Sequence, residues 1–157
     1  MAISDIRNSE CNKYVSQTIF TIGYEGKTPD SFTDQLISNG IKRLIDVRER
    51  AQSRKPGFSQ KRLAQILSDN GIEYLHFKML GSPKNLRIEL NQNGDFDKFA
   101  EAYKKYLASQ REAVNELVRN ASEKPTAIMC YELGSGRCHR SMIASEIAKF
   151  GFNIRNL

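Results

Sequence analysis

One joint recurs along this chain: a helix-like segment, then a glycine, an apolar residue and a strand-like run. It reads "SNGIKRLIDV" at 38–47, "SDNGIEYLHF" at 68–77 and "AKFGFNIRNL" at 148–157. Glycine commonly ends a helix because it adopts the left-handed conformation without strain. Strands that alternate with helices in this way favour a mostly parallel sheet with helices on both faces. The irregular spacing of the joint argues against a solenoid repeat.

The predicted elements follow from this alternation. Strand-like runs cover 18–24, 41–47, 72–77, 125–131 and 152–157. Thr28 is the expected cap of the first helix, with Pro29 in its first turn, and Ser59 is the expected cap of the second. Between the third and fourth runs lies an excursion over about 78–120, predicted as a loop over 78–94 and as helix over 95–120, with a break near Ser109.

The predicted architecture is a single three-layer α/β domain over 18–157, with a mostly parallel sheet of about five strands and helices on both faces. Residues 1–17, which include Cys11, are polar and lack periodicity, so a flexible leader is expected there. A chain of 157 residues with 39% hydrophobic residues is sufficient for one domain with one core.

The hydropathy, cysteine count and net charge of the chain limit its expected location and partners. No apolar run is long enough to cross a membrane and no secretory signal is visible, so the cytoplasm is expected and no membrane partner. Three cysteines are too few for a disulfide scaffold. The net charge of +6 favours phosphate-bearing small molecules or nucleic acid as partners, although a solvated basic surface would give the same charge. No cofactor is predicted, and the oligomeric state stays open.

Polar segments follow four of the predicted strands. Ligands of parallel α/β sheets bind at the carboxyl ends of the strands. The segments at 23–26, 48–57, 77–82 and 132–140 are therefore expected to meet on one rim of the sheet, although they are far apart in sequence. An antiparallel pairing among these strands would contradict this expectation.

The segment "IMCYELGSGRCHRS" at 128–141 carries the strongest chemical signal. Cys130 ends an apolar strand, whereas Cys138 and His139 begin a helix, where the helix end binds anions and lowers the pKa of a thiol. Both cysteines are candidate nucleophiles or redox thiols, and Cys138 is expected to have the lower pKa of the two. His139 or Glu132 would move protons.

Other interpretations of the cysteines stay open at this stage. Cys130 could be a small buried side chain without a chemical role. Zinc could be bound by Cys130, Cys138, His139 and a remote His76, but their spacing matches no common structural zinc pattern. No metal site is therefore predicted.

Arginines on the same rim are the candidate anion-binding residues, because one guanidinium group can donate two parallel hydrogen bonds to a phosphate. Arg54 is expected to reach toward the loop at 130–140 or toward the ligand of that loop, with Ser53 and Asp46 ordering the turn. Asp46 could also act as a base or pair with a loop arginine. The predicted anion-binding and supporting residues are Arg48, Arg54, Arg137, Arg140, Tyr24, Asp46 and Ser53.

Four ordered blocks resemble the uncharacterised family known as domain of unknown function 488, or DUF488. They are "TIGYEG", "LIDVRERAQSRKPGF", "GIEYLHFKMLG" and "IMCYELGSGRCHRSMIASEIAKFG". The resemblance covers roughly 18–157 and implies an α/β fold, but it implies no settled activity. The matching positions are Thr21, Ile22, Gly23, Asp46, Val47, Arg48, Ser53, Arg54, Leu80, Gly81, Cys130, Glu132, Cys138, His139 and Arg140.

A weaker similarity links the chain to rhodanese-like and cysteine-phosphatase domains. "LIDVRE" is similar to the rhodanese strand that ends in Asp-Val-Arg, and "IMCYELGSGRCHRS" is similar to a strand, a catalytic cysteine and a Gly-Arg loop. The phosphatase pattern places five residues between cysteine and arginine, whereas six separate Cys130 from Arg137. Sulfur or phosphoryl transfer is therefore an analogy only.

Three functions are compatible with these patterns. The first is an enzyme that uses a reactive cysteine to act on a phosphate-bearing or nucleotide-like substrate. The second is a non-catalytic nucleic-acid or nucleotide binding module, in which the arginines bind and the cysteines only pack. The third is a structural or regulatory protein that docks a partner through 78–120.

Overall fold

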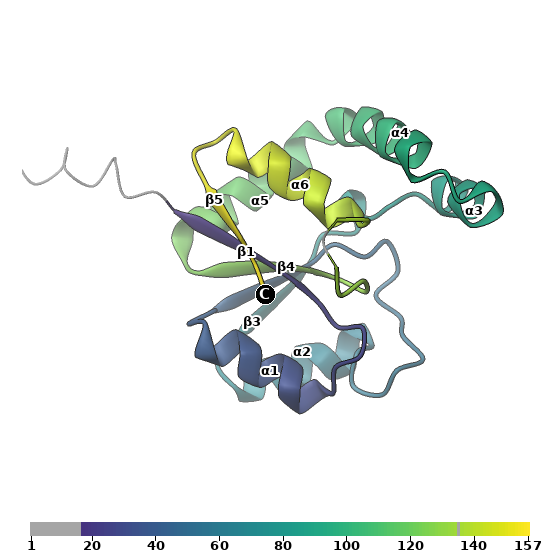
Figure 1. The fold of residues 1–157 in the computed structure, drawn as a ribbon. Coiled ribbons are helices and arrows are strands. Elements are labelled where there is room, and N and C mark those ends of the chain that lie inside the picture. The colour runs from purple at the N-terminus through teal and green to yellow at the C-terminus, as the bar shows by residue number, and fades with distance from the viewer. Residues whose placement is uncertain (1–16, 135) are drawn as a thin grey trace, which may run out of the picture.

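The computed structural model describes residues 17–134 and 136–157 (Figure 1). Apart from residue 17, the predicted leader lies outside the described residues, and so does Cys11. Each neighbouring pair of strands runs parallel, in the order β3-β2-β4-β1-β5, so the predicted sheet is confirmed and is parallel throughout. The strands are β1 (Thr18–Gly23), β2 (Arg43–Asp46), β3 (Glu73–His76), β4 (Thr126–Cys130) and β5 (Asn153–Asn156).

Helices cover both faces of this sheet, as predicted (Figure 1). On one face lie α1 (Pro29–Ser38) and α2 (Gln60–Asp69), and on the other lie α4 (Phe96–Ser109), α5 (Arg111–Glu123) and α6 (His139–Ala148). None of the helices in the described ranges is long and apolar enough to cross a membrane.

Two apolar cores result from the alternation of side chains along the strands. In β4, Ala127 and Met129 pack with the core beneath α1 and α2. Ile128 and Cys130 pack with the core beneath α4, α5 and α6. Cys130 therefore ends its strand on the face that α6 covers, which is the helix that begins immediately after Cys138.

The recurring joint is a helix stop built on a left-handed glycine. Gly40, Gly71 and Gly151 have φ angles of 70°, 71° and 91°. At the other end of α1, Thr28 forms the expected cap, and its hydroxyl accepts from the Ser31 amide at 3.1 Å. Ser59 precedes α2 but makes no side-chain capping bond. The Gln60 amide instead donates to the Ala51 carbonyl at 2.7 Å.

The prediction of a loop over 78–94 is wrong. A short 3-10 turn, η2 (Lys78–Leu80), and a helix, α3 (Lys84–Asn93), occupy most of it. Pro83 and Gly94 are the residues flanking α3, with Gly94 left-handed, so they mark helix ends rather than an open loop. The helix escaped detection because it lies on the surface and buries none of its residues. The predicted break near Ser109 is confirmed, since α4 ends there and α5 begins at Arg111.

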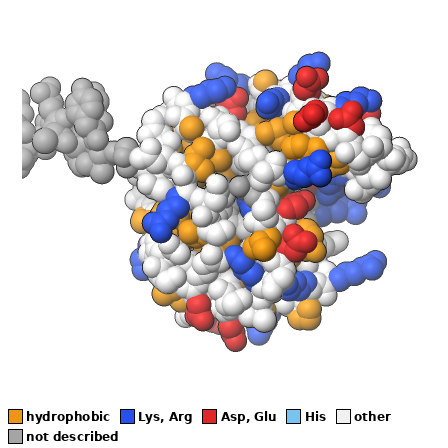
Figure 2. Space-filling model, viewed as in Figure 1, with side chains coloured by type: hydrophobic (Ala, Val, Ile, Leu, Met, Phe, Trp, Pro, Cys, Tyr) orange, Lys and Arg blue, Asp and Glu red, His pale blue; other side chains and the backbone are white. Residues whose placement is uncertain are grey.

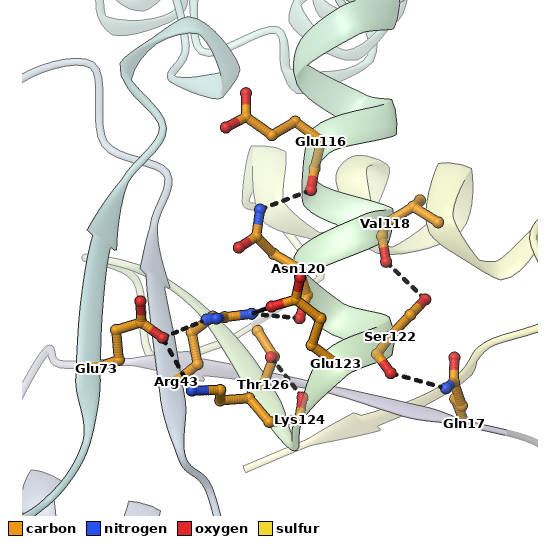
Figure 3. Close-up of polar contacts among 10 residues, drawn as sticks. All are labelled: Gln17, Arg43, Glu73, Glu116, Val118, Asn120, Ser122, Glu123, Lys124 and Thr126. Atoms are coloured by element: carbon orange, nitrogen blue, oxygen red, sulfur yellow. Dashed lines mark hydrogen bonds and ion pairs between the residues drawn. The ribbon is translucent and has the colours of Figure 1, made fainter.

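A buried arginine secures the amino edge of the sheet (Figure 3). The Arg43 Nε donates to Glu73 Oε2 at 2.8 Å, and one of its terminal nitrogens contacts the Asn120 carbonyl at 2.6 Å and Glu123 Oε2 at 3.0 Å. Arg43 thereby joins β2 and β3 to the last turns of α5. This cluster lies at the edge opposite to the one where the strands end.

Candidate functional site

The carboxyl edge of the sheet contains a cavity of about 300 Å³. It lies where β4 meets its neighbours, because α1 and α2 leave β1 and β2 toward one face while α6 leaves β4 toward the other. Chain segments diverge at such a switch point and open a crevice. All four predicted segments contribute to the lining, through Tyr24, Arg48, Ser82, Cys130 and Cys138 among others.

Two cysteines and one carboxylate form a compact cluster in this cavity. Cys130 and Cys138 are both buried and free, and each Sγ lies 3.2 Å from the same Glu132 Oε2. The two sulfurs and this oxygen all lie within 4.8 Å of one another, so these three groups could hold a metal ion. His76, the remote zinc ligand considered from sequence, lies apart from them and pairs through Nε2 with the Arg48 carbonyl at 2.7 Å.

The orientation of His139 follows from its backbone partner. Its Nε2 lies 2.9 Å from the Val47 carbonyl oxygen, which can only accept, so Nε2 carries a hydrogen. In the neutral ring, Nδ1 is then the acceptor, and it faces Cys138 Sγ at 3.8 Å. Cys138 also occupies the N-cap of α6, where the helix dipole favours a thiolate. The pair can thus become a thiolate and an imidazolium.

The two thiols have opposite pKa shifts. A hydrogen bond from Cys130 is the largest cause that lowers the pKa of Cys138 to about 6, with help from His139 and against burial and the Glu132 charge. Burial, followed by the Cys138 thiolate, raises the pKa of Cys130. Burial opposes the charged form of His139, but the Cys138 thiolate outweighs it and raises the His139 pKa. The cluster therefore favours one thiolate, on Cys138, in the order expected from sequence.

Glu132 Oε2 lies 3.2 Å from both sulfurs and can accept a hydrogen bond from either of them while that sulfur carries its proton. Burial would raise the pKa of its carboxyl, but hydrogen bonds from its own backbone amide and from both thiols outweigh burial and lower that pKa. An ionised carboxylate at this position can take a proton from either thiol. Its negative charge also opposes a second thiolate beside it, which is consistent with a single charged sulfur.

Arg140 holds the loop between the cysteines in place. It is only 1% exposed, and its terminal nitrogens donate to the carbonyls of Glu132 at 2.6 Å and Leu133 at 2.9 Å. One of them also lies 3.2 Å from Cys130 Sγ. The close packing requires glycine at position 23, where a Cβ atom would lie 1.8 Å from the Glu132 carbonyl oxygen.

Arg48 has a similar inward orientation. It forms an ion pair with the fully buried Asp46 at 2.6 Å and donates to the Phe58 carbonyl at 2.8 Å and to the Tyr24 hydroxyl at 3.2 Å. Tyr24 in turn stacks on Phe58. Asp46 thus orients a loop arginine, which is one of the roles considered from sequence, and the same Oδ2 that pairs with Arg48 also accepts from the Tyr74 hydroxyl at 2.5 Å.

The remaining arginines lie at or near the cavity mouth. In the view of Figure 2, basic side chains gather on the side where the loop after β2 lies. Arg50 and Arg137 are exposed and line the cavity, and Arg87, another lining residue, pairs with Glu49. Arg54 is exposed and is not among the described residues that line it. Ser53 accepts from the Lys55 amide at 3.1 Å, which orders this turn.

Sequence reasoning missed several residues of the cavity, and three of them bear on ligand binding. Arg50 and Arg87 line it, and so does Ser82, a buried residue whose hydroxyl has no hydrogen-bond partner among the described residues. Arg50 stood in a basic run where nothing distinguished it from its neighbours. Arg87 lay in the segment mistaken for a loop. No local signal distinguished Ser82, whose position depends on how η2 packs against the end of β2.

Comparison with known proteins gives one match. A family model described as Domain of unknown function DUF488 matches residues 28–147, which is more than half of the chain. No curated protein matches the chain, and no solved structure matches it.

Proposed function

This chain belongs to the DUF488 family, and on that premise we propose that its cavity is the active site of a cysteine-dependent enzyme acting on a phosphate-bearing substrate. The observation that carries the proposal is Cys138, a cavity residue placed between His139 Nδ1 and the Cys130 thiol at the N-cap of α6. A structural cysteine has no need of a histidine and a second thiol beside its sulfur at the start of a helix.

Each polar group then has a chemical role. The Cys138 thiolate attacks the electrophilic centre of the substrate, and the His139 imidazolium donates a proton to the leaving group. The Cys130 thiol stabilises the thiolate by a hydrogen bond before attack. Glu132 accepts a proton in any later step. Arg140 and Arg48 keep the loops in position, because their terminal nitrogens are bonded to protein groups.

Binding of the substrate is assigned to the groups that remain available. Arg50 and Arg137 offer positive charge at the mouth, and the unpartnered Ser82 hydroxyl offers a hydrogen bond inside. The volume of about 300 Å³ suits a small molecule rather than a protein segment. Tyr131, half-exposed and edge-on to Tyr24, could stack with a base if the substrate is a nucleotide.

Alkylation of Cys138 by iodoacetamide tests the proposal. We expect Cys138 to react faster than Cys11 at pH 7 and its rate to rise with pH around the pKa of about 6. Inorganic phosphate or a nucleoside monophosphate should slow the reaction, and Arg50→Ala or Arg137→Ala should weaken this protection. A Cys138 that titrates near the ordinary value of about 8.5 would overturn the proposal.

Arg54 belongs to the proposed anion-binding set through its position in the same basic loop. Arg54→Ala is the direct test of that membership, measured as the phosphate concentration that halves the alkylation rate. Weaker protection supports a contact between Arg54 and the bound anion. Unchanged protection would remove Arg54 from the site and leave the roles of Arg50 and Arg137 intact.

A nucleic-acid or nucleotide binding module is the second candidate. The exposed Arg50 and Arg137 beside the exposed Tyr131 favour it, because phosphate contact and base stacking are what single strands require. Binding of a labelled oligonucleotide should then weaken steeply with salt. Equal binding by wild type and Cys138→Ser, without any turnover, would favour this candidate over the enzyme.

A further inference from the structure

We propose that Cys130 and Cys138 form a redox-active dithiol, in which Cys130 resolves an oxidised Cys138 by forming a disulfide with it. The inference rests on the proposed nucleophile, Cys138, and adds a second activity, the reduction of a small hydroperoxide. Its basis is the arrangement of two sulfurs, one carboxylate and one guanidinium at the base of the cavity.

The two sulfurs are close enough to pair after a local movement. They lie within 4.8 Å of each other, whereas a disulfide needs about 2.05 Å. The connection between them contains Gly134 and Gly136, both exposed, where a Cβ atom would meet nothing within 4 Å. This part of the loop therefore has room to shift, while Cys130 stays on its strand.

The first step oxidises Cys138. Its thiolate attacks one oxygen of the hydroperoxide, the O–O bond breaks, and a sulfenic acid forms on Cys138. The leaving hydroxide or alkoxide takes a proton from the His139 imidazolium, whose Nδ1 lies 3.8 Å from Cys138 Sγ. The sulfur is oxidised by two electrons and the peroxide is reduced to water or an alcohol.

The second step uses Cys130. Glu132 Oε2, 3.2 Å from Cys130 Sγ, accepts the thiol proton, and Arg140, also 3.2 Å from that sulfur, stabilises the new thiolate. The Cys130 sulfur attacks the Cys138 sulfur and the S–O bond breaks. The departing hydroxide takes this proton from Glu132 and leaves as water. Two thiols and one hydroperoxide thus give one disulfide, one water and one water or alcohol.

Both sulfurs line the cavity yet are nearly inaccessible at its base, with exposures of 1% and 2%. Such a site admits a compact oxidant but keeps the thiols of other proteins away. This favours a small hydroperoxide over a protein disulfide as the partner of the first step.

The test treats the Cys11→Ser protein with one equivalent of hydrogen peroxide, so that Cys130 and Cys138 are the two cysteines present. We expect both thiols to be lost together, with a mass decrease of two hydrogens and a peptide that joins Cys130 to Cys138. Dithiothreitol should reverse the change. Oxidation of Cys138 to sulfenic or sulfinic acid with Cys130 still free would overturn the inference.

Cys130→Ser in the same background is the matched variant, because serine keeps the size and a donor but cannot form a disulfide. We expect its Cys138 sulfenic acid to persist and to be trapped by dimedone. Alkylation of the unoxidised protein reports on the proposed nucleophile separately, so failure of the disulfide step leaves that result untouched. Zinc retained in equimolar amount by the purified protein, together with resistance to peroxide, would overturn the dithiol in favour of a metal site.

Discussion

Two cysteines eight positions apart differ because their nearest partners differ. Glu132 Oε2 lies 3.2 Å from both sulfurs, but Cys138 also faces the His139 imidazole and occupies the N-cap of α6, whereas Cys130 faces the Arg140 guanidinium and packs in the apolar core. The donor that most lowers the Cys138 pKa is the Cys130 thiol itself. The chemistry of either residue therefore depends on the presence of the other.

Substitution of Cys130 tests this dependence. Cys130→Ala removes the donor, so we expect the Cys138 pKa to rise from about 6 toward the ordinary value of about 8.5. Cys130→Ser keeps a hydroxyl donor and should leave the pKa lower than in the alanine variant. The measurement is the alkylation rate of Cys138 between pH 5 and 9. A Cys130→Ala protein in which Cys138 titrates as it does in wild type would mean that the Cys130 donor is unimportant.

Gly23 is essential to the loop that carries Glu132. A Cβ at this position would lie 1.8 Å from the Glu132 carbonyl oxygen and 2.7 Å from an Arg140 nitrogen. We expect Gly23→Ala to displace the loop, lower the free energy of unfolding by about 1–3 kcal/mol and slow Cys138 alkylation at pH 7. Gly134→Ala, in open space on the same loop, is the control and should change stability little. Equal effects of both substitutions would contradict the packing argument.

At the scale of elements, the excursion between β3 and β4 shapes one side of the cavity. The Tyr103 hydroxyl from α4 donates to the Leu80 carbonyl at 2.7 Å, and the Tyr106 hydroxyl donates to the Met79 carbonyl at 2.7 Å. Both bonds hold η2, which leads directly into Ser82. The Tyr103 ring also contacts His139 edge-on. The aromatic residues of α4 are therefore packing contacts that link the helices to the site.

The two tyrosines form a matched pair for an unfolding experiment. Tyr103→Phe leaves the Leu80 carbonyl unpaired in a buried place, and we expect a loss of about 1–3 kcal/mol in the free energy of unfolding. Tyr106→Phe removes a bond of the same length where water can replace it, so its cost should be smaller. Urea denaturation of both variants measures the difference. A larger loss for Tyr106→Phe would contradict this assignment.

At the scale of the whole molecule, stabilising ion pairs and the reactive thiols lie at opposite edges of the sheet. Arg43 and its partners stabilise the amino edge, and the cysteine cluster occupies the carboxyl edge (Figures 1 and 3). The central strands β2 and β4, which connect them, are buried on both faces. Stability and thiol reactivity should therefore be separable by substitution at one edge.

Arg43→Met tests this separation. The change removes two ion pairs and a carbonyl contact, and we expect a loss of about 2 kcal/mol, less than for fully buried pairs because Glu73 and Glu123 reach water. The Cys138 alkylation rate in the folded protein should stay unchanged. Lys124→Met, which removes an exposed partner of the same Glu73, is the control and should cost under about 1 kcal/mol. Altered Cys138 reactivity in Arg43→Met would show that the edges are coupled.

Local sequence was enough to determine the alternation of strands and helices, the left-handed glycine stops and the parallel sheet. It also located the cavity edge and the cluster around Cys138, because the carboxyl ends of parallel strands must meet. These features depend on spacing and backbone preference, which are properties of neighbouring residues. The surface helix α3 was missed because little apolar burial supports it.

Only the tertiary structure decided what each arginine does. Arg48, Arg137 and Arg140 all carry the same guanidinium in similar basic surroundings, yet Arg48 and Arg140 are buried against protein acceptors while Arg137 faces the cavity mouth. The acceptors are the carbonyls of Phe58, Glu132 and Leu133 and the Asp46 carboxylate, and folding brings them within reach. The acceptors nearest in space decide where a guanidinium group points. These acceptors come within hydrogen-bond distance of it only after the loops have packed.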